Sequence, residues 1–314
     1  MSKIIAVVGA TGAQGGGLVR AILADPSSGF TARALTRKAS GDKADALRKL
    51  GAEVVAADLD DQASLEQAFA GCYGAYCVTN YWEHLKPEKE LSQATNMARA
   101  AKSAKLEHLV WSTLEDTRQR VPLSDARMPT LMGKYKVPHF DAKGEADAAF
   151  AAAGVPTTYL LTSFYWENFI YFGMGPKRGT DGRFALALPM GEAPLAGIAA
   201  EDIGKCAYGI FRQGKKWIGQ RVGIAGDHVT GRQMALDMSS ALGQPVSYVA
   251  VDFDTYRGFG FPGADDLGNM FQYYVEFAKE FAGARSLATA RALNPELLSF
   301  EAWLAKYGKQ IPLT

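Results

Sequence analysis

A glycine-rich segment near the N-terminus has the composition of a loop that binds a pyrophosphate. Its sequence is Gly9-Ala10-Thr11-Gly12-Ala13-Gln14-Gly15. Glycine tolerates positive φ and lets the backbone approach a phosphate, and the N-terminus of a following helix offers free N–H donors. Three glycines alone are a weak signal, because the chain has 33 of them and a plain strand-to-helix turn can look similar. Here the segment follows an apolar run, residues 4–8, and opens an expected helix, which favours a dinucleotide site.

The residues after the second expected strand indicate which dinucleotide would bind. An NAD site has an acidic residue at this place, whose carboxylate bonds the 2′-hydroxyl of the adenosine ribose. This chain has Arg37 and Lys38 there and no carboxylate within residues 35–38. A guanidinium and an ammonium favour a 2′-phosphate by charge and, for arginine, by its paired donors. We therefore expect NADP(H) rather than NAD(H), although two cations after a strand are also found on solvated surfaces.

Alternating strands and helices must position these residues, and the first half of the chain has that pattern. The expected strands are residues 4–8, 31–35, 53–57, 75–78, 108–112 and 157–161. The expected helices between them are residues 15–24, 43–50, 64–70, 91–105 and 139–153. Strands separated by helices at this spacing predict right-handed crossovers and an α/β fold, a doubly wound parallel sheet of the Rossmann type.

The pattern loosens after residue 162, where a smaller α+β domain is expected. Helices are expected at residues 200–212, 232–241, 267–282 and 295–307, and strands at 219–225 and 246–251. We expect residues 1–162 to form the NADP(H)-binding Rossmann domain, whose sheet can receive later strands. Residues 163–314 would form the smaller domain on the side of the substrate or partner.

The bulk composition excludes several classes of protein. With 34 Lys+Arg against 33 Asp+Glu, the chain lacks the basic excess of proteins that bind nucleic acid directly. No uncharged run approaches the roughly 18 residues of a membrane-spanning helix, so no membrane association is expected. Three cysteines without C-x-x-C spacing indicate reduced thiols in a cytoplasmic protein, and the scattered histidines indicate no metal site. The oligomeric state stays open.

Several segments together resemble the NmrA-like family of atypical short-chain dehydrogenase/reductases. The segments that carry the resemblance are the glycine loop, Thr36-Arg37, the turn at 57–61, Val110–Leu114, His139–Glu145 and Ser163–Phe169. They keep the family's order along essentially the whole chain.

The resemblance implies a set of contacts with NADP(H). The residues implied to surround the pyrophosphate are Gly9, Thr11, Gly12, Ala13, Gln14 and Gly15. Arg37, with Lys38, would bind the 2′-phosphate. Asp58 and Leu59 would flank the adenine, although Asp58 could equally cap the helix expected near residue 64. Thr79 and Asn80, which end a strand, would pass near the nicotinamide ribose.

One residue departs from the usual reductase pattern. Short-chain reductases carry Tyr-x-x-x-Lys, in which the phenol exchanges a proton with the substrate oxygen. This chain keeps the lysine as Lys143, a candidate catalytic residue and cofactor ligand, but His139 stands where the tyrosine belongs. The spacing of four keeps both on one helical face. Histidine titrates near neutral pH, but the helix N-terminus and Lys143 disfavour its charged form, so packing or capping is favoured over catalysis by His139.

Two functions from different classes follow. A retained cofactor loop without the tyrosine slightly favours an NADP(H)-responsive redox sensor, a regulatory protein that contacts a partner protein and has weak or no turnover. The alternative is an NADPH-dependent reductase of a small carbonyl, quinone or aromatic substrate, which needs less help with protonation when the acceptor is conjugated. Aromatic residues at 164–172 and the later Phe271, Tyr273, Tyr274 and Phe277 favour that alternative, because they could stack a flat substrate.

Overall fold

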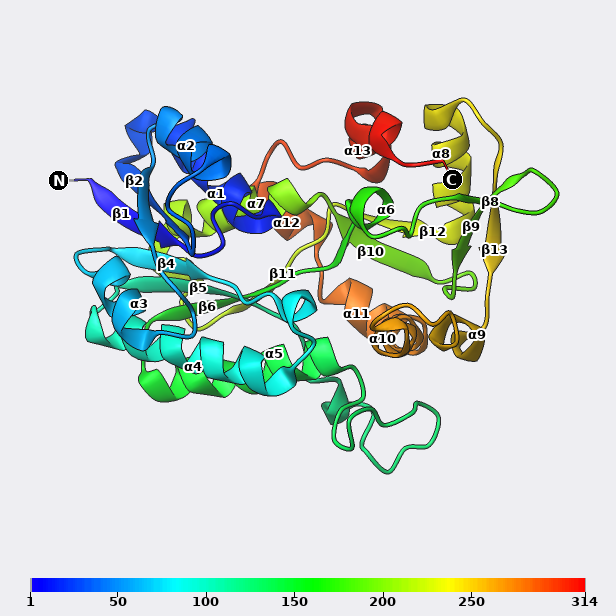
Figure 1. Ribbon diagram of the computed structural model, residues 1–314, viewed down its shortest axis with the longest axis horizontal. Helices are drawn as coiled ribbons and strands as arrows, with labels where there is room; N and C mark the ends of the chain where they lie inside the picture. The colour runs from blue at the N-terminus through cyan, green and yellow to red at the C-terminus, as the bar shows by residue number, and fades with distance from the viewer. Residues whose placement is uncertain (1, 314) are drawn as a thin grey trace.

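A seven-stranded parallel sheet carries the expected alternation of strands and helices (Figure 1). The computed structural model describes residues 2–313. In order across the sheet, the strands are β11 (Arg221–Gly223), β6 (Thr157–Leu161), β5 (His108–Thr113), β4 (Gly74–Cys77), β1 (Lys3–Val7), β2 (Phe30–Thr36) and β3 (Glu53–Ala56). The chain order reverses between β1 and β4, and sheets of this kind bind ligands at the carboxyl ends of the strands beside the reversal.

Helices cover both faces of the sheet because its central strands are apolar on both sides. In β1, Ile5 and Val7 pack into one layer and Ala6 into the other, and all three are fully buried. One layer contains α1 (Ala13–Leu23), α2 (Asp42–Lys49), α7 (Ala200–Gln213) and α12 (Leu287–Leu293). The other contains α3 (Gln62–Phe69), α4 (Pro87–Ser103) and α5 (Pro138–Ala153). The predicted doubly wound Rossmann fold is confirmed.

A smaller α+β part lies beyond the carboxyl ends of the strands, on the right of Figure 1. One of its sheets has the strand order β12 (Asp227–Thr230), β10 (Pro194–Ile198), β7 (Phe164–Tyr165), and the other β13 (Val246–Ala250), β9 (Phe184–Leu188), β8 (Lys177–Arg178). Its helices are α6 (Asn168–Tyr171), α8 (Gly231–Leu242), α9 (Phe253–Arg257), α10 (Ala264–Glu276), α11 (Ala278–Gly283) and α13 (Phe300–Tyr307). An aromatic core that includes Trp166, Phe271 and Trp303 joins these elements.

The chain returns from the second part to the first. The expected strand at 219–225 is the three-residue β11, which pairs with β6 at the edge of the main sheet. Helix α7 packs along α1, and α12 packs on α7. A division of the sequence at residue 162 therefore leaves three later elements that complete the first part in space.

Other elements of the second half differ from the sequence expectation. The helix expected at 267–282 is two helices, α10 and α11, that meet at Phe277. The helix expected at 295–307 begins only at Phe300, after Ser299, whose side chain caps it. Strands β7, β8, β9, β10 and β12 and helices α6, α9 and α12 were not expected, because segments this short carry too little periodicity to distinguish strand from helix.

The contact between α1 and α7 depends on two glycines. A Cβ atom on Gly204 would lie 2.2 Å from the backbone nitrogen of Leu18, and one on Gly17 would lie 2.4 Å from the carbonyl oxygen of Glu201. We expect Gly204→Ala to lower the free energy of unfolding by about 1–3 kcal/mol, because backbone atoms cannot move aside as a side chain can. Urea denaturation measures this. The control Gly283→Ala meets no atom within 4 Å, and equal midpoints for the two variants would contradict the prediction.

Candidate active site

A cleft of about 720 Å³ opens at the carboxyl ends of the parallel strands, beside the reversal of strand order. The predicted site residues that line it are Gly9, Thr11, Gly12, Ala13, Gln14, Gly15, Arg37, Asp58, Leu59, Thr79, Asn80, His139 and Lys143. Lys38, which was expected beside Arg37, is exposed and is not among the lining residues. The fold thus brings all but one of these residues to a single cleft.

The N-terminus of α1 presents free donors to this cleft. Gly12 is its N-cap and has no side chain to accept from the first N–H groups, and the first turn contains no acidic residue. Gly9 has a φ of 65°, and a Cβ atom on Gly15 would lie 2.5 Å from the Gly9 carbonyl oxygen. Unpaired N–H groups and the positive end of the helix dipole suit a bound pyrophosphate.

The side chain of Gln14 ties the glycine loop to the sheet. Its amide donates to the hydroxyl of Tyr165, and its oxygen accepts from the hydroxyls of Tyr76 and Ser112, the latter at 2.9 Å. Burial raises the pKa of Tyr165 to about 12, so this phenol stays protonated. Because the Gln14 side chain is held by protein groups, its backbone is what remains available to a phosphate.

At the adenosine end of the cleft, Arg37 follows β2 and lies against a carboxylate. Its Nη1 atom donates to Oε1 of Glu83 at 2.5 Å. This hydrogen bond and the charge of Glu83 raise the pKa of Arg37. Asp58 follows β3 and lines the cleft, and the capping role considered for it belongs to Asp61, which accepts from two N–H groups at the start of α3.

Lys143 extends from α5 into a polar cluster at the end of β4. Its ammonium donates to the hydroxyl of Thr79 at 2.6 Å, to the Thr79 carbonyl at 3.2 Å and to Oε2 of Glu90 at 3.1 Å. Glu90 is completely buried and was not identified from the sequence. The sequence does contain a pattern that could have identified it. Glu90 lies four and seven residues before Ala94 and Met97, which places all three on the buried face of α4.

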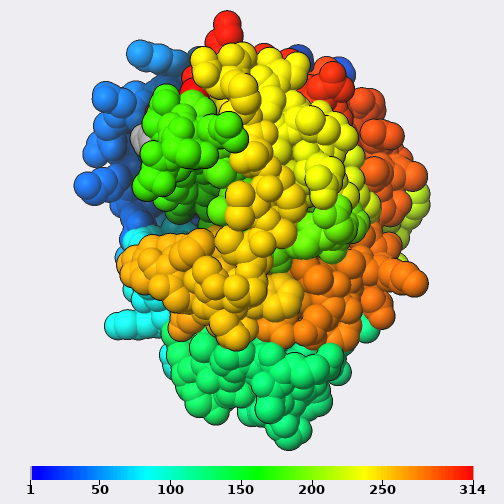
Figure 2. Space-filling view, turned by 90° about the vertical axis from the view of Figure 1, so that its right-hand side faces the viewer, coloured from blue at the N-terminus to red at the C-terminus, as the bar shows by residue number. Residues whose placement is uncertain are grey.

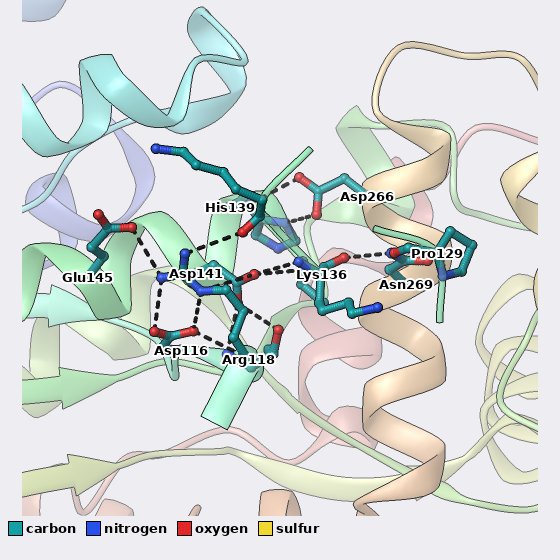
Figure 3. Close-up of polar contacts among 12 residues, drawn as sticks. Asp116, Arg118, Pro129, Lys136, His139, Asp141, Glu145, Asp266 and Asn269 are labelled. Atoms are coloured by element: carbon teal, nitrogen blue, oxygen red, sulfur yellow. Dashed lines mark hydrogen bonds and ion pairs between the residues drawn. The ribbon is translucent and has the colours of Figure 1, made fainter. Parts of the chain in front are cut away.

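His139 lines the cleft and is held by a carboxylate from the second part of the chain. Its ring Nδ1 lies 2.7 Å from Oδ1 of Asp266 in α10, and its backbone N–H donates to Oδ2 at 3.2 Å (Figure 3). The ring also packs against Trp82, with centroids 4.8 Å apart. Since a carboxylate accepts the proton on Nδ1, the other ring nitrogen, Nε2, is left for a group in the cleft. No local sequence pattern links Asp266 to His139, which is 127 residues away.

A polar network fixes the start of α5, and therefore His139, in place. Asp141 accepts from the backbone N–H groups of Lys136 and Thr117 at 2.7 and 2.8 Å (Figure 3). The Asn269 amide of α10 donates to the Lys136 carbonyl at 2.5 Å. Burial raises the pKa of Asp141, and the hydrogen bonds that it accepts from Thr117 and Lys136 oppose that rise.

The same network fastens the long loop between β5 and α5. Asn269 also donates to the carbonyl of Pro129 at 2.9 Å, and Gln272 donates to that of Arg127 at 2.9 Å. The loop projects at the lower edge of Figure 1 and forms the lower lobe of the face seen in Figure 2. Tyr135, which also lies in this loop, is buried and is not among the residues that line the cleft.

The same cleft also has an apolar part of its lining, contributed by the second part of the chain, which we call the apolar chamber. It is lined by Phe164, Phe172, Met174, Phe261, Leu267, Met270 and Tyr274. Of the later aromatic residues considered for substrate stacking, Tyr274 lines the cleft, whereas Phe271, Tyr273 and Phe277 are not among the lining residues.

Residues 2–313 lack two kinds of feature. No three His, Cys, Asp or Glu side chains of this range gather as a metal site requires. No helix in the same range has the length and apolar character needed to cross a membrane.

Known proteins are similar to this chain along nearly its whole length. The NmrA-like family domain-containing oxidoreductase lnbB of Aspergillus flavus is 26% identical over 321 residues, which cover 96% of this chain and 91% of lnbB. The crystal structure of NmrA, a negative transcriptional regulator, in complex with NADP matches with a TM-score of 0.79 and 24% identity, covering 98% of this chain and 96% of that one. Triphenylmethane reductase of Citrobacter sp., complexed with NADP(H), matches with a TM-score of 0.73 and 19% identity, covering 98% and 100%. The family model described as NmrA-like matches residues 1–304, which confirms the predicted family: this chain belongs to the NmrA-like family.

Proposed function

We propose that this chain is an NADPH-dependent reductase of a flat carbonyl, quinone or other aromatic compound. The observation that carries the proposal is the apolar chamber, whose residues line the same cleft as those expected near the nicotinamide, Thr79, Asn80 and Lys143. A dinucleotide alone would not need this second wall. Apolar and aromatic lining with a few polar groups is typical of sites for small molecules, and aromatic rings stack flat ones.

The binding of NADP(H) is supported by donors at matching places in the cleft. The free N–H groups of α1 would bind the pyrophosphate, and Arg37 would bind the 2′-phosphate. Lys143 would hold the hydroxyls of the nicotinamide ribose beside Thr79 and Asn80. NmrA and triphenylmethane reductase, which share the fold, were both solved with this dinucleotide.

The chemistry divides between the dinucleotide and His139. NADPH, held by the N-terminus of α1, Arg37 and Lys143, would supply the hydride. His139, doubly protonated, donates the proton on Nε2 to the acceptor oxygen as negative charge develops there. Asp266 stabilises the charged ring before the transfer and keeps the remaining proton on Nδ1 afterwards. Solvent at the mouth of the cleft then returns a proton to Nε2.

A redox-sensing regulatory role with a protein partner is the second candidate. The histidine in place of the usual tyrosine favours it, and the sequence alone put it first. Two features favour the reductase instead: the Asp266 contact, which the sequence did not reveal, and the apolar chamber, which contains Phe164, Phe172 and Tyr274 of the expected aromatic wall. Loss of NADPH absorbance with a panel of quinones, aldehydes and triphenylmethane dyes tests the choice. Oxidation of NADPH by at least one flat acceptor is expected, and binding without oxidation would support the sensor.

The apolar chamber can be tested at an exposed wall residue. Phe172 lines the cleft and its side chain is 63% exposed, so its truncation leaves the core intact. We expect Phe172→Ala to raise KM for a flat acceptor by about three- to tenfold, the value of a lost aromatic contact, with an unchanged KM for NADPH. Tyr171→Ala is the matched control, because Tyr171 is adjacent and 69% exposed but is not a lining residue. Equal effects of the two changes would contradict this role of the chamber.

A further inference from the structure

The adenosine end of the cleft contains a carboxylate that the end of β2 lacks. Glu83 belongs to the short 3₁₀ helix η2 (Tyr81–Glu83), which follows β4. Its Oε1 atom accepts from Arg37 Nη1 at 2.5 Å across 46 residues of sequence, and both residues line the cleft. Residues 35–38 contain no acidic residue, but the fold supplies one from the segment after β4, which is separated from β2 by β1 in the sheet.

Among the described carboxylates at this end of the cleft, Glu83 is the one that pairs with Arg37. Asp60 is bound to Lys89 at 2.8 Å and to the amide of Gln93 at 2.9 Å. Asp58 accepts from the backbone N–H of Asp60 at 3.0 Å. Among the described residues, Arg37 is the one hydrogen-bond partner of the Glu83 side chain.

NADP(H) and NAD(H) would interact differently with the pair of Arg37 and Glu83. A 2′-phosphate must replace Glu83 on Arg37 or share the guanidinium with it, and it then lies close to a like charge. A 2′-hydroxyl can donate to the Glu83 carboxylate while Arg37 stays paired, which is what the acidic residue at the end of β2 does in an NAD site. The pair therefore weakens the binding of NADP(H) and supports that of NAD(H).

We propose that Glu83 is a specificity-determining residue that narrows the preference of this site for NADP(H) over NAD(H). The inference rests on the proposed binding of a dinucleotide but not on turnover. Both side chains are largely exposed, at 63% for Arg37 and 47% for Glu83. Solvent screens an exposed pair, so the effect amounts to several-fold in affinity rather than to a complete switch.

Calorimetric titration of the full chain with NADPH and with NADH tests the proposal. Glu83→Gln keeps the size of the side chain and removes its charge. We expect it to tighten NADPH by about threefold or more and to weaken NADH by about twofold or more. Glu88→Gln is the matched control, because Glu88 is exposed in the first turn of α4 and is not a lining residue. It should leave the ratio of the two dissociation constants unchanged.

The outcomes separate this inference from the proposed function. A ratio that shifts only in Glu83→Gln, and shifts less at high salt, supports the role of Glu83. Equal changes for both dinucleotides, or the same shift in Glu88→Gln, overturn it. The titration does not measure turnover. If the chain reduces no acceptor, the proposed reductase function is wrong, but the ratio of the dissociation constants for NADPH and NADH still decides the role of Glu83.

Discussion

His139→Phe is expected to lower kcat for acceptor reduction by about 10²-fold or more, the usual contribution of a positioned general acid. Phenylalanine keeps a planar ring against Trp82 but has no proton to donate. The affinity for NADPH should not change, because hydride supply and dinucleotide binding do not use the ring. Stopped-flow measurement of NADPH oxidation at saturating dinucleotide gives the rate. A decrease of threefold or less would show that His139 has only a packing role.

The partner of His139 offers a second variant at the same site. Asp266→Asn keeps the shape of the side chain but presents an N–H donor to Nδ1, which favours the opposite tautomer. As a positioning residue, Asp266 should affect kcat and its pH profile while KM for NADPH stays constant. An Asp266→Asn variant with the wild-type profile and rate would contradict the assigned tautomer.

Lys143→Met is the other change with a large expected effect. It removes a charge-assisted donor from the expected ribose contact, which should lower kcat/KM for NADPH by about 10- to 100-fold. It also leaves Glu90 completely buried without its cationic partner. Loss of one member of such a pair costs about 3 kcal/mol or more of unfolding free energy. Urea denaturation and initial rates measure the two effects separately.

The double variant Lys143→Met, Glu90→Gln separates the structural role of Lys143 from its functional one. Replacing the buried carboxylate by a neutral amide should restore most of the lost stability, because no unpaired charge remains. Turnover should stay low, since the contact with the ribose is still absent. Recovery of both the unfolding free energy and the turnover would mean that Lys143 has only a structural role.

The local part of the site was predictable because its signals lie within a few residues of one another. The glycine loop, Arg37 and the spacing of His139 and Lys143 are each read within one strand–helix unit, and the structure gathers them in one cleft. The doubly wound parallel sheet follows from the same alternation of apolar runs and helices.

What the sequence could not show are contacts across long separations. Asp266 is 127 residues from His139, Glu90 is 53 from Lys143 and Glu83 is 46 from Arg37. Each brings a carboxylate to a cation or a histidine. The electrostatic argument against a charged His139 counted only the helix N-terminus and nearby residues, and Asp266 was absent from that count. Lys38 shows the opposite case: it is adjacent to Arg37 in the sequence but is not among the residues that line the cleft.

Transfer of deuterium from NADPH labelled at C4 of the nicotinamide tests the central claim most directly. The wild-type chain is mixed with labelled NADPH and with the panel of acceptors, and mass spectrometry follows the products. The reductase account predicts label at the reduced carbon of at least one flat aldehyde or dye, with oxidised dinucleotide formed in equal amount. Tight binding of NADPH with no label in any product would contradict it and leave the regulatory role.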